Sequence, residues 1–491
     1  MARRRGTVRD AVAPSVDDPV VRTLSEGVGG PVGTRSAGHP WWTPVRVVLA
    51  LTAVCLALGM WQKSSCYDDG WQDGSARYSH MCYSDLPYLY TGRGFAELAW
   101  PYSDDAGTRS RYDVMEYPVG IAYWAWGAAW VTHWVSGSPD VGPRAAVPVG
   151  RLWGMPKVRA EVRAFVVVNA VGFAALALLA AWLLAGVNPR RPWDAAGFAL
   201  SPALALTGLI NWDLLAVVLV AGALWAWARG RPILTGVLLG LGTATKLYPL
   251  FLLGGILVIC LRRRRLRALA LTAAATAVAW VVADLPAYVS SPSDWKVFWT
   301  FNSARGADLG SVWLVAQQAL DHTGHPFAFS PHTINVVSWV GFALWCAGVL
   351  ALGLTAPATP RLAQLGLLVV VGFLLVNKVY SPQYVLWLLP LAALARPRWR
   401  DLLLWQAGEV LYFATVWWYL GGYLAPAGGG DAGFYWVAVV LRVVAQLWLV
   451  AVVVRDIRLP RRDPVRQALG PGPATPGGGQ TSTIRSNAVV V

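Results

Sequence analysis

Apolar residues occur along this chain in long runs separated by short polar segments, a pattern typical of proteins built from membrane-spanning helices. A spanning helix needs about 20 apolar residues, and many of the runs approach that length. The pattern therefore predicts an all-α fold, a polytopic bundle of transmembrane helices. Thirteen apolar segments lie near residues 44–62, 117–136, 162–187, 193–210, 212–228, 232–245, 247–261, 268–286, 333–356, 362–376, 385–395, 401–420 and 434–454.

Clusters of arginine predict which segment ends face the cytoplasm, because cytoplasmic loops carry an excess of Lys and Arg. The clusters comprise Arg229 with Arg231, residues 262–267, Arg361, Arg396 with Arg398 and Arg400, and residues 455–462. The intervening loops are then expected on the outer side of the membrane. They lie at 211–213, 246, 287–332, 377–384 and 421–433.

The expected position of the first long polar loop, residues 63–116, implies that one of the apolar segments does not cross the membrane. It holds nine acidic residues against five Lys or Arg, a net charge of −4, and is also expected outside. An even number of crossings must connect it with the outer loop at 211–213, yet three apolar segments intervene. Either 117–136 or the Pro-containing 193–210 is therefore re-entrant, interfacial or fused with its neighbour. About 12 crossings remain.

Composition agrees with a membrane protein and excludes a soluble one: 56% of residues are hydrophobic, 14% are charged, and the mean hydropathy is +0.46. The net charge of +15 does not indicate a nucleic-acid partner, because the arginines cluster at segment ends. Residues 1–40 and 456–491, rich in Gly, Pro, Ser and Arg, are predicted to be disordered cytoplasmic tails. They flank a membrane domain, 41–455, whose external loops are 63–116 and 287–332.

Two of the five cysteines bear on the compartment of the first polar loop. Cys66 and Cys82 both lie in it and would pair if the loop faces an oxidising exterior, although two cysteines alone leave the pairing open. The other three, Cys55, Cys260 and Cys346, lie inside apolar segments and are interpreted as small core residues.

Two lysines interrupt apolar stretches in similar contexts: Lys246 in Thr-Lys-Leu-Tyr-Pro and Lys378 in Asn-Lys-Val-Tyr-Ser-Pro-Gln-Tyr. A charge at membrane depth costs about 2.5–3.5 kcal/mol on insertion scales and usually marks a substrate or ion site. The alternative is that these side chains snorkel to the interface. Because the predicted topology places both lysines at the outer turns of short hairpins, snorkelling would be easy. Their shared face and Tyr-Pro context, rather than their depth, favour a function.

Asp85 is a lone carboxylate among aromatic and apolar residues, in the context Tyr83-Ser84-Asp85. An aspartate in a partly apolar pocket has a raised pKa and can act as a general base. A helix cap or a surface charge is the alternative interpretation. Glu116, before Tyr-Pro, and Asp213, after Asn-Trp, also precede apolar segments, and both can be explained as helix caps. The expected position of Asp213 on the face of the lysines favours a function.

The loop 287–332 combines Arg305 with several tryptophans, a set that can bind a phosphate and stack on a sugar ring. Its histidines lack the close helical pairing of common zinc motifs, and no phosphate-cradling Gly-rich loop is present in the sequence. We therefore expect no metal, no cofactor and no soluble nucleotide-sugar site.

Together these residues suit a reaction with a lipid-linked phosphate donor on one face of the membrane. The cations would hold the phosphate and stabilise it as it leaves, while the carboxylate deprotonates an acceptor hydroxyl. Aromatic rings would hold the sugar.

The order of these motifs resembles that of the GT-C polyprenol-phosphate-dependent glycosyltransferases, and most nearly glycosyltransferase family 87, which includes the mannosyltransferase of phosphatidylinositol mannoside synthesis. The resemblance rests on Tyr-Ser-Asp, Glu-Tyr-Pro, Asn-Trp-Asp and the two lysine motifs, and covers about residues 44–455. One departure is Tyr117-Pro118-Val119, where the family often has two prolines after the tyrosine.

The resemblance implies an inverting transferase with a polyprenyl-phosphate sugar donor and a catalytic aspartate in the first external loop. Asp85 would be the base, and Lys246, Arg305 and Lys378 would contact the donor phosphate. Mannose is the expected sugar, with arabinofuranose as the alternative, and the acceptor would be a cell-envelope glycan or glycolipid. The remaining residues expected to bind substrate are Tyr83, Glu116, Asp213, Tyr248, Tyr380 and Gln383.

A lipid or sugar transporter of envelope biosynthesis is the alternative function, because transporters also need intramembrane charges. The long external loop with a candidate base favours the enzyme. In either case we expect a multi-pass protein of the cell membrane, with both termini cytoplasmic and the active site outside.

Overall fold

The computed structural model describes residues 18–28, 41–425 and 432–467, and within them the chain is built from helices without strands. Five helices are long and apolar enough to span a membrane. They are α2 (Pro44–Gln62), α9 (Pro156–Val187), α15 (Leu266–Ser290), α19 (Pro331–Thr355) and α23 (Gly433–Arg458). The chain is therefore an all-α membrane protein, as the hydropathy pattern predicts; the number of crossings stays a prediction.

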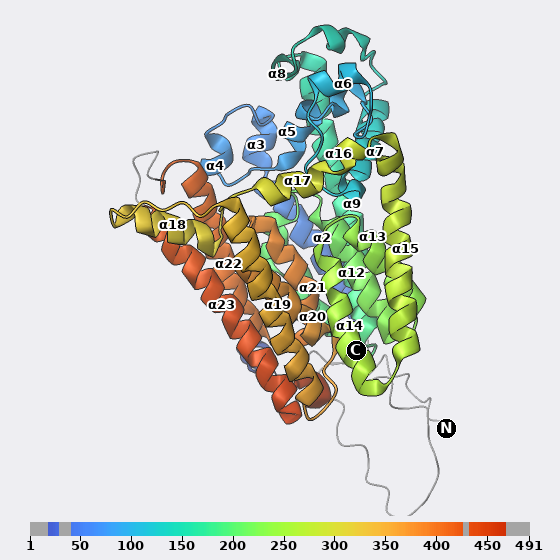
Figure 1. Cartoon of the computed structure of the whole chain (residues 1–491), viewed down its shortest axis with the longest axis vertical. Helices are drawn as coiled ribbons and strands as arrows, with labels where there is room; N and C mark the ends of the chain where they lie inside the picture. The colour runs from blue at the N-terminus through green and yellow to red at the C-terminus, as the bar shows by residue number, and fades with distance from the viewer. Residues whose placement is uncertain (1–17, 29–40, 426–431, 468–491) are drawn as a thin grey trace, which may run out of the picture.

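Shorter apolar helices complete the bundle between the long ones (Figure 1). They are α12 (Asp213–Ala228), α13 (Pro232–Thr243), α14 (Leu252–Arg263), α20 (Leu362–Val376) and α21 (Val385–Ala395), together with the longer α22 (Trp399–Leu420).

Short helices gather at one end of the bundle, which we call the loop end (upper part of Figure 1). Between α2 and α9 lie α3 (Ser64–Asp69), α4 (Ala76–Ser79), α5 (Asp85–Gly92), α6 (Ala106–Arg111), α7 (Val119–Val135) and α8 (Val149–Leu152). Between α15 and α19 lie α16 (Pro292–Trp295), α17 (Val297–Ala304) and α18 (Val312–His322).

The predicted apolar segments coincide closely with helices: 44–62, 362–376 and 385–395 match α2, α20 and α21 residue for residue. The segment 193–210 differs, because it is broken into three short helices. These are η4 (Pro192–Ala195), α10 (Ala196–Ala199) and α11 (Pro202–Thr207). The break before α11 falls at Ser201-Pro202, where proline occupies the first helical position and the Ser201 hydroxyl caps the helix.

Helix α7 does not carry the chain from one end of the bundle to the other. Arg111 precedes α7 in the chain, and Arg144 and Val147 follow it. The Arg111 guanidinium donates hydrogen bonds to the carbonyl oxygens of Arg144 (2.9 Å) and Val147 (2.7 Å). Both flanks of α7 therefore lie at the loop end, and Figure 1 shows the helix in this upper part of the molecule. Of the two candidates left open by the sequence, 117–136 is the segment whose two flanks both lie at the loop end.

The boundaries of the two predicted tails need correction. Residues Pro19–Val28 form helix α1, and the Asp18 carboxylate accepts a hydrogen bond from the backbone N–H of Trp399. At the other end, α23 continues to Arg458 and the chain stays packed through Gln467, with Asp463 fully buried. The prediction of a tail from residue 456 is thus wrong for 456–467. Residues 1–17, 29–40 and 468–491 lie outside the described part.

Arginines at the end opposite the loop end are buried in ion pairs. Arg361, at the start of α20, pairs with Asp463 at 3.0 Å and also donates to the Ala395 carbonyl oxygen. Arg396 bridges Asp401 and Asp456, each at 2.8 Å. The positive charges that we used to predict orientation therefore also join α20, α21, α22 and the chain after α23.

Substitution Asp463→Asn should lower the free energy of unfolding by about 3–5 kcal/mol, because it leaves the buried Arg361 guanidinium without a counter-charge. Thermal unfolding of the purified protein in lipid nanodiscs measures the change. Asp113→Asn is the matched control, because the Asp113 side chain is 93% exposed. Equal melting temperatures of the two variants would contradict this account.

Close packing of α13 on α15 depends on two glycines one helical turn apart. A Cβ atom at Gly236 or Gly240 would press against the backbone carbonyl oxygens of Thr272 and Thr276, respectively. Small residues at this spacing allow helix backbones to approach closely in membranes. This contact sets the position of α13, whose C-terminal end leads into Lys246.

Gly240→Ala should destabilise the protein by about 1–3 kcal/mol and force α13 away from α15, because the added methyl group overpacks a backbone contact. Gly254→Ala on α14 is the control, since its Cβ would have no atom within 4 Å. Thermal unfolding of both variants tests the prediction, which fails if Gly240→Ala is as stable as the control.

Candidate active site

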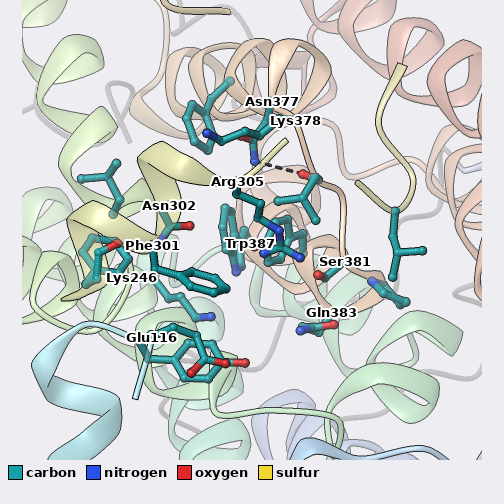
Figure 2. A pocket seen from close by; sticks show the side chains of 18 of the residues that line it. Glu116, Lys246, Phe301, Asn302, Arg305, Asn377, Lys378, Ser381, Gln383 and Trp387 are labelled. Carbon is teal, nitrogen blue, oxygen red and sulfur yellow. Dashed lines mark hydrogen bonds between the residues drawn. The ribbon is translucent and has the colours of Figure 1, made fainter. Parts of the chain in front are cut away.

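A cavity of about 590 Å³ opens between the loop end and the bundle, and it brings together residues from every motif singled out in the sequence except Asn211-Trp212-Asp213. Figure 2 shows Glu116, Lys246, Arg305, Lys378 and Gln383 around it. Asp85 and Tyr83 also line it. Among its further polar and aromatic lining residues are Tyr78, Tyr117, Asn302, Asn335, Asn377, Tyr384, Trp387 and Trp417.

Asp85 begins helix α5, where the Ser84 hydroxyl caps the helix. Its carboxylate accepts hydrogen bonds from Tyr83 OH (2.7 Å), Asn211 Nδ2 (2.7 Å) and Tyr117 OH (3.3 Å). Burial raises the pKa of Asp85 above its ordinary value, while these hydrogen bonds oppose the rise. Burial and hydrogen bonding together give a carboxylate that is oriented, poorly hydrated and able to take a proton.

The segment before Asp85 is held by side-chain donors along its backbone. Gln62 Nε2 donates to the carbonyl oxygens of His80 and Met81, at 3.3 and 2.7 Å. Trp71 Nε1 donates to the next carbonyl, that of Cys82, and Lys63 Nζ donates to that of Tyr83. Four consecutive carbonyls, 80–83, are therefore each bound by a side chain.

A disulfide between Cys66 and Cys82 ties the same segment to α3, so the pairing that the sequence left open is present. Lys63, which holds the Tyr83 carbonyl, is 1% exposed, and burial lowers its pKa to about 7, although the nearby Asp85 carboxylate opposes this shift. The position of the candidate base therefore depends on the end of α2 and on the disulfide.

Lys246 follows α13 and is paired with a buried carboxylate. Its Nζ lies 3.5 Å from Asp213 Oδ1 and 4.7 Å from the centroid of the Tyr117 ring. Asp213 is 0% exposed and also accepts a hydrogen bond from Trp387 Nε1 at 2.6 Å. Asp213 does not line the cavity, and the structure places it behind Lys246, with which it pairs.

The other two cations come from two loops that contact each other. Arg305, at the end of α17, binds the Asp308 carboxylate, with Nε 2.6 Å from Oδ2. Lys378 Nζ donates to the neutral Asn335 Oδ1, and no ion pair of Lys378 occurs among the described residues. Burial and the charge of Arg305 lower the pKa of Lys378. An anion that bound between Arg305 and Lys378 would offset both the loss of hydration of Lys378 and the repulsion between the two cations.

Backbone hydrogen bonds join the loops that carry Arg305 and Lys378. The N–H of Asp308 donates to the Lys378 carbonyl at 2.8 Å, and the N–H of Tyr380 donates to the Leu309 carbonyl at 2.6 Å. Next to them, Gly310 has φ of +66°, and its N–H donates to Tyr435 OH of α23. The two loops therefore behave as one unit that is anchored on α23.

A buried polar network below these loops was not predicted from the sequence. Glu409 accepts hydrogen bonds from Tyr380 OH, Trp405 Nε1 and Gln446 Nε2. The Arg442 guanidinium lies 3.6 Å from the Tyr380 ring centroid and donates to the Gly310 carbonyl. Glu409, Arg442 and Gln446 are isolated polar residues inside predicted apolar segments. The criterion applied to the two lysines would have identified them.

The structure separates the other predicted substrate residues into two groups. Tyr83, Glu116 and Gln383 line the cavity, and Glu116 is paired with Arg93 at 2.9 Å. Tyr248 and Tyr380 are 0% exposed and do not line it, so the structure places both behind the cavity wall. Tyr248 instead stacks on Trp387, with ring centroids 4.7 Å apart.

The cavity therefore combines three functional elements: an oriented carboxylate, three cations and a wall of aromatic and apolar side chains. Such a site can deprotonate a hydroxyl and stabilise a phosphate. Within residues 18–28, 41–425 and 432–467, no group of three His, Cys, Asp or Glu side chains is placed to hold a metal ion.

Comparison with known families shows one similarity. Residues 142–377 match glycosyltransferase family 87, a region that includes Lys246 and Arg305 and ends one residue before Lys378. No curated protein matches the chain. Asp85 lies before the matched region, so its assignment rests on the geometry of the cavity. The matched region, residues 142–377, indicates a glycosyltransferase, and the long apolar helices indicate a membrane protein.

Proposed function

We propose that this protein transfers a sugar, with inversion, from a polyprenyl-phosphate donor to a hydroxyl of a cell-envelope glycan or glycolipid. Mannose is the sugar we assign, and arabinofuranose is the alternative. The observation that carries the proposal is a single cavity that is lined by the Asp85 carboxylate and by three cations, Lys246, Arg305 and Lys378.

The donor phosphate would bind between Arg305 and Lys378. Lys378 is the better candidate for the main contact, because its described partner is the neutral Asn335 and its charge is incompletely compensated. Next to the cations, an apolar part of the cavity suits a prenyl chain. It is lined by Phe301, Trp339, Phe342, Phe373 and Val376, from α17, α19 and α20.

In the proposed reaction, the acceptor oxygen attacks the anomeric carbon and its proton moves to the Asp85 carboxylate. The bond between the anomeric carbon and the phosphate oxygen breaks, and its electron pair leaves with the polyprenyl phosphate. The cations stabilise the charge that develops on this phosphate. Because the attack comes from the face opposite the leaving group, the anomeric configuration inverts.

We assign the cavity to the outer face of the membrane and both termini to the cytoplasm. The arginine-rich segment ends lie at the opposite end of the bundle, as expected for the cytoplasmic side. The Cys66–Cys82 disulfide supports an oxidising compartment for the loop end.

Asp85→Asn should lower kcat/KM for sugar transfer by about 10²–10⁴-fold, because the base is lost while the shape of the side chain is kept. Membranes carrying the variant would be assayed with radiolabelled polyprenyl-phosphomannose and a panel of envelope lipids. Asp104→Asn, at an exposed position, is the control. Full transfer by the Asp85 variant would show that Asp85 is not the base.

The acid limb of the pH profile gives an independent test of the same residue. Burial raises the pKa of Asp85 above 3.8, so the base becomes protonated at a higher pH than an ordinary aspartate does. Below that raised pKa, kcat/KM should fall about tenfold per pH unit. A rate that stays constant down to pH values near 4 would show that Asp85 is not the base.

Lys378→Gln should lower kcat by about 10²–10³-fold, because the leaving phosphate loses a cation that stabilises it. Lys378→Arg should recover part of the loss, and Lys157→Gln, at an exposed position, is the control. Folded protein is quantified in parallel by size-exclusion chromatography. Equal loss of folded protein and activity would indicate a structural role for Lys378.

A further inference from the structure

The two oxygens of the Asp85 carboxylate have different environments. Oδ2 accepts hydrogen bonds from Asn211 and Tyr117, whereas among the described residues Oδ1 accepts only from Tyr83 OH. Each carboxylate oxygen has about two lone-pair directions. Oδ2 is therefore occupied, and Oδ1 has a direction left for the hydroxyl that gives up its proton.

One of the cations, Lys246, lies on the Oδ2 side. Tyr117, which donates to Oδ2, has Lys246 Nζ 4.7 Å from its ring centroid. An inverting displacement requires the attacking oxygen and the leaving phosphate on opposite sides of the anomeric carbon. If the phosphate binds to the cations, the acceptor must approach from the Oδ1 side, where Tyr83 lies.

On the Oδ1 side, three aromatic rings line the cavity together. Tyr78 and Tyr83 are parallel within 9°, with ring centroids 6.3 Å apart. Trp417, from the end of α22, lies 5.1 Å from Tyr83 and 6.4 Å from Tyr78. We call Tyr78, Tyr83 and Trp417 the aromatic platform.

The aromatic platform is held in place from several directions. The Arg77 guanidinium, which does not line the cavity, lies 4.8 Å from the Tyr78 ring centroid. Lys63 holds the Tyr83 carbonyl, and the disulfide at Cys82 adjoins Tyr83. A rigid set of rings binds a flat ligand with little loss of side-chain entropy.

We infer that the aromatic platform is the acceptor subsite, and that the group it binds is an uncharged sugar ring with one hydroxyl directed at Asp85 Oδ1. The C–H bonds on a face of a sugar ring carry partial positive charge and attract the negative face of an aromatic ring. None of the three platform side chains is charged, so nothing in it attracts a phosphate or a carboxylate. The inference rests on the proposed function, because that function defines the donor side.

Equilibrium binding of radiolabelled octyl α-D-mannopyranoside to the full-length protein in lipid nanodiscs tests the subsite without a donor. Alkyl-glycoside detergents are excluded because they would compete. Tyr78→Leu, which removes a ring but keeps an apolar side chain, should raise the Kd about tenfold, the change expected for loss of a stacked ring. Tyr78→Phe keeps the ring and should bind within about twofold of the wild type. Tyr288→Leu, at an exposed tyrosine outside the cavity, is the control.

A second arm of the experiment separates this inference from the proposed function. The wild-type protein is given polyprenyl-phosphomannose with octyl α-D-mannopyranoside or with 1-O-octylglycerol, and release of polyprenyl phosphate is measured. Saturable binding of the glycoside, weakened by Tyr78→Leu and retained by Tyr78→Phe, supports the subsite even if no donor is turned over. Absence of any donor turnover counts against the proposed function.

Two results would overturn the subsite itself. One is a failure of the wild-type protein to bind the glycoside saturably, or a preference of the wild-type protein for octylglycerol over the glycoside as acceptor. The other is equal binding by the Tyr78→Leu and Tyr288→Leu variants, which would show that the rings are structural.

Discussion

Charge buried in an apolar bundle must be compensated, and this constraint determines where the distant parts of the chain meet. Lys246 and Asp213 come from neighbouring segments and pair at 3.5 Å, while Arg361 and Asp463 are separated by 102 positions and pair at 3.0 Å. A buried charge without its partner costs several kcal/mol. The ion pairs therefore connect helices at defined points, one set holding the cavity and the other the opposite end of the bundle.

The same constraint explains why the cavity can bind an anion. The positive charges of the three cations are compensated to different degrees. Lys246 is paired with the buried Asp213, and Arg305 with the half-buried Asp308. The described partner of Lys378 is the neutral Asn335, so its charge is compensated least. The cations are thus held firmly but are not fully neutralised. Below them, the network around Glu409 and Arg442 fixes the loops that present two of the three cations, so their spacing does not depend on the ligand.

The sequence predicted the helices well because an apolar run of sufficient length has few alternatives in a membrane. It predicted the site in part. Asp85, Lys246 and Lys378 were identified because each interrupts an apolar or aromatic context, and they line one cavity. Tyr248 and Tyr380 lie two residues after the lysines in the same motifs, but both are fully buried in the bundle. Proximity in a motif therefore did not establish contact with the cavity.

By itself, the sequence determined the all-α membrane architecture, the position of most helices and the isolated charges, because each depends on local hydropathy. The tertiary structure decided that 117–136 returns to the loop end, that Asp213 holds Lys246, and that the two oxygens of Asp85 differ in their partners. Those facts depend on which side chains from separate helices face one another. Such contacts are set by packing across the whole bundle, and hydropathy along the chain does not encode them.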